Sequence, residues 1–171
     1  MAAVTVRRAR PTDAAAMARV HVASWRSTYR GLMSDALLDD PGFVGRRESF
    51  WTAALTDGRP GRNRIAVAEH DDTVIGIAMA GPGAGDDVDG VQLYVLYLLD
   101  GHHGSGAGSA LLDAVIDPDE AAVLWVADPN PRAQAFYRKR GFAFDGVEQV
   151  DEGVRERRMV RTPTERTASP E

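Results

Sequence analysis

Hydrophobic and polar residues follow two periods along this chain of 171 residues. Apolar residues three or four positions apart between Pro11 and Gly31 predict an amphipathic helix. Shorter alternating or continuous apolar runs predict strands, and Asp71-Asp72 joins two of them into a hairpin. The predicted strands are 4–9, 65–69, 73–80, 92–99, 121–127, 142–148 and 154–161, and the predicted helices are 12–30, 34–38, 43–56, 110–116 and 131–140. This order predicts a mixed sheet with helices on both faces.

The stretch 92–116 carries the clearest candidate site. It begins with an almost unbroken apolar and aromatic run, which is typical of a strand buried on both faces. Four glycines then crowd into a short turn, and apolar residues at helical spacing follow. A helix N-terminus leaves backbone N–H groups unpaired, and glycines let a bulky anion approach that backbone. The pattern therefore predicts a phosphate or pyrophosphate ligand, with a purely structural turn as the alternative.

Two common glycine fingerprints do not fit this turn. A P-loop ends in Gly-Lys-Ser/Thr, and the turn contains no lysine. The dinucleotide pattern requires Gly or Ala at its third glycine position, where Ser109 or Leu111 stands in this chain. A nucleotide-binding domain that places ATP on the same turn stays open as an alternative function.

Composition excludes several classes of function. The formal net charge of −5 at pH 7 argues against a nucleic-acid partner. The absence of cysteine excludes disulfides, thiolate metal sites and a cysteine nucleophile. Because no apolar run reaches membrane-spanning length and no secretory leader is apparent, we expect no membrane partner and a cytoplasmic location. The length fits one domain, expected over 1–161, and a polar tail over 162–171 is expected to be disordered.

The glycine turn resembles the acetyl-CoA loop of the GNAT N-acetyltransferase superfamily. That loop reads Gln/Arg-x-x-Gly-x-Gly/Ala, and this chain has His103-Gly104-Ser105-Gly106-Ala107-Gly108, with His103 in the usual Gln/Arg position. The segment 124–142 resembles the superfamily's strand followed by Asn-x-x-Ala-x-x-Phe-Tyr-x-x-x-Gly-Phe. The resemblance implies the GNAT fold, an α/β (α+β) architecture with a mixed, mostly antiparallel sheet of six to seven strands. It also implies helices on both faces and a splayed central strand pair.

The resemblance further implies where acetyl-CoA, the expected cosubstrate, binds. Pantetheine would lie between the splayed strands and bond to main-chain groups of Leu96 and Leu98, and the amide near Leu98 would meet the oxyanion. The glycine turn would wrap the pyrophosphate, and Asn130 would help to hold the pantetheine arm. The expected cofactor-binding residues are Leu96, Tyr97, Leu98, His103, Gly104, Ser105, Gly106, Ala107, Gly108, Ser109 and Asn130.

Acyl transfer from a thioester to an amine requires a general acid and a route for the amine's proton. Tyr137 matches the family's tyrosine that protonates the leaving thiolate, and a phenol pKa of about 10 is close to that of an alkyl thiol. Family members often carry a glutamate base on the central strand or the next one, but Gln92 and Trp125 stand at those places. Three routes stay open: a chain of waters, an amine that arrives neutral, or a base in the N-terminal half. The candidates for such a base are His21, His70 and Glu69.

The acceptor site is expected from the first helices and the mouth of the strands. The segment 25–31 resembles a Trp-Arg-x-Thr-Tyr-x-Gly segment found in acetyltransferases that act on small molecules and polyamines. Trp25 and Tyr29 share a helix face, where they either stack on a cationic amine or pack in the core. We place Trp25, Tyr29 and Gln92 in the substrate site.

The sequence is therefore identified as a GNAT N-acetyltransferase, an acyltransferase acting on a primary amine of a small molecule, polyamine or peptide. Because cysteine is absent, direct attack in a ternary complex is favoured. The missing carboxylates leave an alternative from another class, an acetyl-CoA-binding sensor or regulatory protein with little catalysis. Dimers are common in the superfamily, so a homodimer is a further expectation. We expect no metal, because the adjacent His102 and His103 point their side chains apart.

Overall fold

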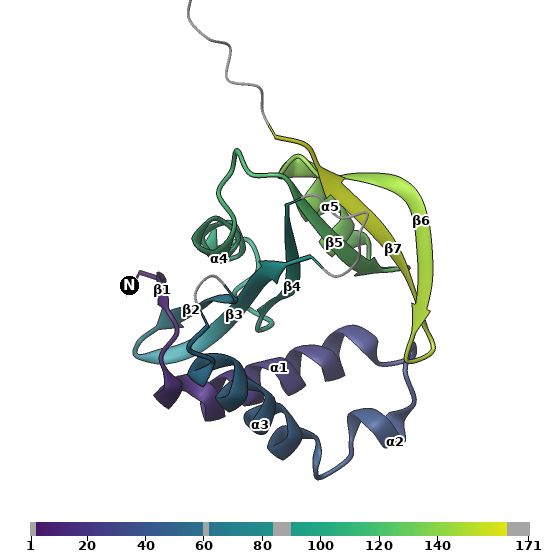
Figure 1. Cartoon of the computed structure of the whole chain (residues 1–171). Helices are drawn as coiled ribbons and strands as arrows, with labels where there is room; N and C mark the ends of the chain where they lie inside the picture. The colour runs from purple at the N-terminus through teal and green to yellow at the C-terminus, as the bar shows by residue number, and fades with distance from the viewer. Residues whose placement is uncertain (1–2, 60–61, 84–89, 164–171) are drawn as a thin grey trace, which may run out of the picture.

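The computed structural model describes residues 3–59, 62–83 and 90–163. Its strands form one seven-stranded sheet in the order β1-β2-β3-β4-β5-β7-β6, in which β4 and β5 are the parallel pair (Figure 1). The strands are β1 (Thr5–Arg8), β2 (Arg64–His70), β3 (Thr73–Pro82), β4 (Val91–Leu98), β5 (Ala122–Ala127), β6 (Ala143–Asp151) and β7 (Val154–Arg161). The predicted mixed, mostly antiparallel sheet is confirmed.

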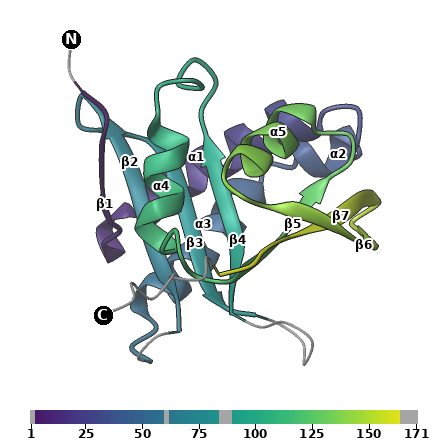
Figure 2. The same ribbon diagram turned by 90° about the horizontal axis from the view of Figure 1, so that it is seen from above.

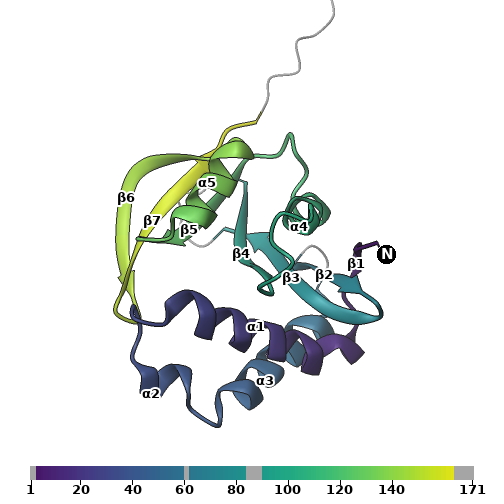
Figure 3. The ribbon, with the colours of Figure 1, turned by 180° about the vertical axis from the view of Figure 1, so that it is seen from behind.

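Helices cover both faces of this sheet, as predicted (Figures 2 and 3). The helices are α1 (Ala14–Tyr29), α2 (Asp35–Leu38), α3 (Phe43–Thr56), α4 (Ala107–Val115) and α5 (Pro131–Lys139), and a 3-10 turn over Pro11–Asp13 precedes α1. Helices α1 and α3 pack together on one face, and α4 packs on the other face against β1, β2, β3 and β4. Within the described residues, no helix has both the length and the apolar character needed to cross a membrane.

Alternation over 65–68 of β2 and 77–80 of β3 lets one sheet pack against two different helix layers. The face under α4 presents Ala66, Ala68, Ala78 and Ala80, whereas the face under α1 and α3 presents Ile65, Val67, Ile77 and Met79. Small side chains allow α4 to lie close to the strands. At Gly76 an added Cβ would lie 2.8 Å from Leu111 Cδ1, so a side chain there would require the leucine to shift.

Local signals in the sequence fix several element ends. Asp71 and Asp72 have φ values of 50° and 58°, which suits a tight turn between antiparallel strands. Ser34 Oγ accepts a hydrogen bond from the Leu37 amide over 3.3 Å and caps α2, as predicted. The start of α4 differs from the prediction by three residues, because the helix begins at Ala107, inside the glycine turn, and not at 110.

The central strands β4 and β5 pair over only three residues each. Val91 pairs with Ala122 and Leu93 pairs with Leu124, and no register continues beyond that point. β4 goes on to Leu98 beside β3, and β5 goes on to Ala127 beside β7. The two strands therefore separate after Leu93, which confirms the predicted splay (Figure 2).

An irregularity in β4 marks the start of this separation. Met79 of β3 pairs with Val95 and Ala80 pairs with Leu93, so Tyr94 is left as an extra residue in a bulge. Tyr94 is 40% exposed. The expectation that the strand is buried on both faces is therefore wrong beyond Leu93, where the neighbouring strand is missing.

The last hairpin is longer than predicted. β6 extends to Asp151, not to 148, and turns through Glu152 and Gly153, both with positive φ, into β7. The extra residues carry the tip of the hairpin toward α1 (Figure 1). Most of the expected disordered tail, 164–171, lies outside the described residues.

Candidate active site

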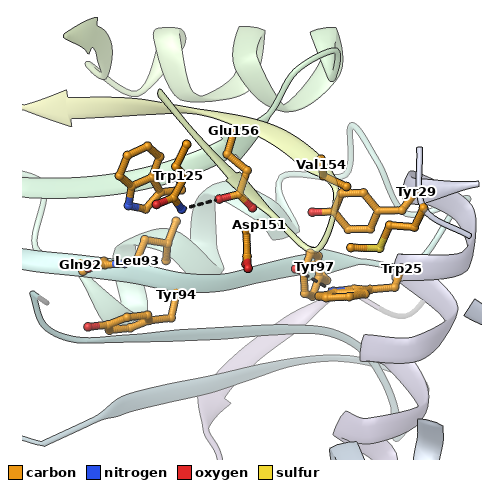
Figure 4. A pocket seen from close by; sticks show the side chains of 12 residues that line it. Trp25, Tyr29, Gln92, Leu93, Tyr94, Tyr97, Trp125, Asp151, Val154 and Glu156 are labelled. Carbon is orange, nitrogen blue, oxygen red and sulfur yellow. Dashed lines mark hydrogen bonds between the residues drawn. The ribbon is translucent and has the colours of Figure 1, made fainter. Parts of the chain in front are cut away.

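A cavity of about 240 Å³ lies at the mouth of the separated strands (Figure 4). Four parts of the chain meet around it: the end of α1, strand β4, the middle of β5 and the hairpin of β6 and β7. Its lining residues are Trp25, Tyr29, Met33, Gln92, Leu93, Tyr94, Tyr97, Trp125, Gln149, Asp151, Val154 and Glu156. All three residues that the sequence places in the substrate site, Trp25, Tyr29 and Gln92, are among them.

Aromatic side chains form one wall of this cavity. Trp25 Nε1 donates a hydrogen bond to the Tyr97 hydroxyl over 2.9 Å, and the rings of Trp25 and Tyr29 lie 5.2 Å apart. Burial raises the pKa values of the Tyr29 and Tyr97 phenols, so both stay protonated at neutral pH. The Arg47 guanidinium lies 5.2 Å from the centre of the Trp25 ring. The sequence left open whether Trp25 and Tyr29 stack on an amine or pack in the core; in the structure both line the cavity and pack against each other, and their role in substrate binding stays a prediction.

Acidic side chains of the hairpin form the opposite wall. Asp151 and Glu156 both line the cavity, and Gln149 Nε2 donates a hydrogen bond to Glu156 Oε2 over 2.8 Å. Burial raises the pKa of the Glu156 carboxyl, and the negative charges of Asp151 and Glu152 act in the same direction. The cavity lining contains no arginine or lysine. The wall therefore favours a cationic guest.

Sequence reasoning missed these two carboxylates. The predicted end of β6 at 148 left Asp151 in a loop, and Glu156 stands in a strand whose alternation mixes arginine and glutamate. One signal was present: Val154 and Glu156 are two residues apart, so they share a face, and Val154 is buried. A buried valine at the tip of a polar hairpin indicates that this face is covered.

The glycine turn ends in the first turn of α4. Gly101, Gly104 and Gly106 have φ values of 89°, 80° and 85°, which side chains rarely adopt. Ser105 Oγ donates to the His102 carbonyl over 2.6 Å and accepts from the Ala107 amide over 3.3 Å. The amides of the next two residues, Gly108 and Ser109, precede the first intrahelical hydrogen bonds of α4 and are the donors that an anion would use.

His103 differs from the Gln or Arg of the resembled loop, and its neighbours are acidic. Its Nε2 lies 3.5 Å from Asp100 Oδ1, while Asp100 Oδ2 accepts a hydrogen bond from Ser27 Oγ over 2.6 Å. The turn is thereby tied to α1. Within the part of the chain that the structure describes, no group of three acidic or histidine side chains has the arrangement of a metal site.

Tyr137 lies on α5 and is 9% exposed. Its ring is held between Phe136 and Phe142, with centroid distances of 5.4 and 5.8 Å. Burial raises the pKa of its phenol, and the phenol of Tyr97 adds to this effect. Asn130 Oδ1 accepts a hydrogen bond from the Ala133 amide over 3.3 Å and caps α5, which leaves its NH₂ group directed elsewhere.

The three N-terminal candidates for a base do not line the cavity. His21 is buried, and its Nδ1 accepts a hydrogen bond from Trp51 Nε1 over 3.2 Å. Glu69 accepts a hydrogen bond from Arg7 over 2.6 Å on β2. His70 lies at the far end of β2, with its ring 5.5 Å from that of His102. Glu69 and His70 therefore lie away from the cavity, whereas His21 packs behind the aromatic wall, with its ring 5.2 Å from that of Tyr97.

Comparisons with known proteins agree with this geometry. The model of the acetyltransferase (GNAT) family matches residues 20–142. A probable N-acetyltransferase of Mycobacterium tuberculosis is 28% identical over 84% of this chain and 82% of its own length. The uncharacterized N-acetyltransferase YuaI of Bacillus subtilis is 32% identical over 75% of this chain and 74% of its own. A crystal structure of a paia N-acetyltransferase from Thermoplasma acidophilum in complex with coenzyme A has a TM-score of 0.74 and 19% identity, and the match covers 94% of this chain and 99% of that one.

Proposed function

The chain belongs to the acetyltransferase (GNAT) family, and we propose that it transfers an acetyl group from acetyl-CoA to a primary amine. The observation that carries this proposal is the end of pairing between β4 and β5 after Leu93 and Leu124. It leaves strand edges that do not pair with each other, next to the acidic cavity, and Tyr137 packs in the same apolar cluster as Leu96 and Leu98 of β4. The slot between such edges suits an extended thioester whose reacting end points at the cavity.

The cofactor side of the slot consists of backbone more than of side chains. Main-chain groups of Leu96 and Leu98 that do not pair with β3 face the open side and suit the amides of pantetheine. The amide near Leu98 is proposed to bind the oxyanion. The turn from His103 to Ser109 suits the pyrophosphate, and the NH₂ group of Asn130 suits a pantetheine carbonyl.

The proposed reaction is direct attack in a ternary complex. A neutral amine forms a C–N bond to the acetyl carbonyl, the C–S bond then breaks, and the departing thiolate takes a proton from Tyr137. Burial keeps this phenol protonated until it is needed. The same desolvation destabilises the thiolate formed beside it, so the proton transfer stays nearly balanced although the pKa of the phenol is raised.

The acceptor side of the slot suits a cationic amine. Rings of Trp25 and Tyr29 offer faces for an alkylammonium group, and Asp151 and Glu156 offer negative charge. This combination fits an amine of a small molecule, a polyamine or a peptide, and it disfavours acceptors that carry a carboxylate close to the nitrogen.

Calorimetric titration with acetyl-CoA, with ATP and NADH as controls, tests the cofactor. Selective binding of acetyl-CoA is expected, and preference for ATP would contradict the proposal. Tyr137→Phe tests catalysis, because it removes one oxygen that has no hydrogen-bond partner among the described residues. We expect acetylation to fall by about a hundredfold or more with acetyl-CoA affinity unchanged. Binding of acetyl-CoA without acetylation of any amine would instead favour the sensor function.

A further inference from the structure

The proton of the acceptor amine needs a base that the sequence does not provide at the expected places. A primary ammonium has a pKa of about 10, so only about one amine in a thousand is neutral at pH 7. Gln92 and Trp125 line the cavity where family members often carry a glutamate, and neither an amide nor an indole accepts a proton at this pH. Two carboxylates line the cavity, Asp151 of β6 and Glu156 of β7, whereas Gln92 and Trp125 belong to β4 and β5.

Glu156 has the better position of the two. It pairs with Ala127 at the end of β5 and with Gln149 of β6, so its backbone is fixed from both sides. Its side chain points into the cavity between Trp125 and Val154, on the side away from the exposed tip (Figure 4). Asp151 sits next to that tip and is exposed. Glu156 is therefore the more desolvated carboxylate.

The surroundings of Glu156 leave it basic and partly unoccupied. Gln149 donates to Oε2 only, so Oε1 remains for a guest. The neighbouring arginines of β7 serve other carboxylates, because Arg155 and Arg157 pair with Glu148 on the opposite face of the strand. Burial raises the pKa of Glu156, and the hydrogen bond from Gln149 opposes this rise without reversing it. The charged and titratable groups around it are Tyr29 from α1, Tyr97 from β4, Asp151 from β6, Glu152 from the turn, and Arg158 on its own strand, which pairs with Asp145.

We propose that Glu156 is the base that accepts the proton of the acceptor ammonium, and that Gln149 positions its carboxylate. This inference rests on the proposed function and names the group that completes it. The arrangement in the structure that carries it is an unpaired carboxylate oxygen, held by a side-chain amide, in a cavity of aromatic rings at the open end of the β4–β5 slot.

The proton balance of the reaction follows from this assignment. The ammonium gives one proton to Glu156 Oε1, and the neutral amine forms the C–N bond. When the tetrahedral intermediate collapses, the C–S bond breaks and the thiolate takes the Tyr137 proton. The nitrogen loses a second proton, which restores the Tyr137 phenol, and Glu156 releases the first proton to water. One proton is set free per acetyl group transferred, as conversion of an ammonium to an amide requires.

Glu156→Gln tests the proposal with two probe amines. The first is n-propylamine, which is protonated at pH 7, and the second is 2,2,2-trifluoroethylamine, which is neutral there. We expect kcat/KM for n-propylamine to fall by about a hundredfold or more at pH 7. The loss should become about tenfold smaller for each unit by which the pH is raised, because the neutral fraction of the amine in solution rises about tenfold. For trifluoroethylamine the loss is expected to be small, because that amine needs no base before it attacks.

Matched variants separate catalysis from structure. Glu48→Gln removes the charge of an exposed glutamate on α3 that lies outside the cavity, and it is expected to leave kcat/KM unchanged. Gln149→Ala is expected to lower kcat without changing acetyl-CoA affinity. An equal loss with both amines at every pH would show that Glu156 only shapes the site, and full activity of Glu156→Gln would also overturn the proposal. If the wild-type protein binds acetyl-CoA but acetylates neither amine, the proposed function itself fails first.

Discussion

His21 couples the stability of this protein to pH. It lies on α1 with 3% of its surface exposed, and its Nδ1 accepts a hydrogen bond from Trp51 Nε1. The ring of Tyr97 lies 5.2 Å away, so the imidazole connects the helix layer to the aromatic wall of the cavity. Burial lowers its pKa to about 3, and the positive charge of Arg47 acts in the same direction. In the folded protein, His21 is therefore neutral throughout the usual working range of pH.

The size of the effect follows from the difference between the two states. In the unfolded chain the imidazole has a pKa of about 6.5, so between pH 6.5 and 3 the unfolded state binds a proton that the folded state does not bind. The stabilisation that neutral His21 contributes is complete above pH 6.5 and is lost as the pH falls toward 3. Each pH unit within this window costs about 1.4 kcal/mol, so lowering the pH from 7 to 5 costs about 2 kcal/mol from this residue.

Urea denaturation of the wild-type protein and of His21→Gln at pH 7 and pH 5 measures this cost. Glutamine keeps an acceptor oxygen for Trp51 Nε1 but does not titrate. The remaining titratable groups are common to both proteins and cancel in the comparison. We expect the wild type to lose about 2 kcal/mol more than the variant between the two pH values. Equal losses would refute the reasoning and show that His21 is protonated in the folded state.

Other predictions follow from the glycine turn, the acidic wall and the core. Gly106 and Gly101 both have a positive φ and open space where a Cβ would lie, so Gly106→Ala and Gly101→Ala should each lower the free energy of unfolding by about 1 kcal/mol. Calorimetry should show about tenfold weaker binding of acetyl-CoA for Gly106→Ala and unchanged binding for Gly101→Ala. With n-propylamine and β-alanine as matched acceptors, kcat/KM should be about tenfold or more lower for β-alanine, and Asp151→Asn should narrow that difference. Trp51→Ala should destabilise the protein by about 3–5 kcal/mol in urea denaturation, because the indole is fully buried.

The elements that carry the candidate cofactor residues were predictable because their determinants are local. The glycine turn, the cap at Asn130 and the ring of Tyr137 lie close together in the sequence, on elements whose type the hydrophobic pattern already predicts. Positive φ at Gly104 and Gly106 is a property of the turn itself and needs no partner elsewhere in the chain.

The acceptor half depends on contacts between distant segments, and sequence reasoning could identify only its aromatic members. The indole of Trp25 reaches Tyr97 across 72 positions of sequence, and no periodicity encodes that hydrogen bond. Glu156 becomes a site residue only because β6 is three residues longer than its hydrophobic pattern suggests, which brings the hairpin over the slot. A polar strand that covers a cavity with one face has no distinctive composition, so the residues at which it begins and ends are hard to predict from the hydrophobic pattern.

The sheet register links the two halves of the site mechanically. Ala127 is the last paired residue of β5, the strand that forms one edge of the slot, and its partner across β7 is Glu156. A shift of β7 by one residue would turn Glu156 away from the cavity and direct Arg155 or Arg157 into it. The ion pairs of those arginines with Glu148 oppose such a shift, since Glu148 pairs in register with Arg157. The charges on the outer face of the hairpin thus help to determine which side chain faces the cavity, and the cavity keeps its negative charge through ion pairs that lie outside it.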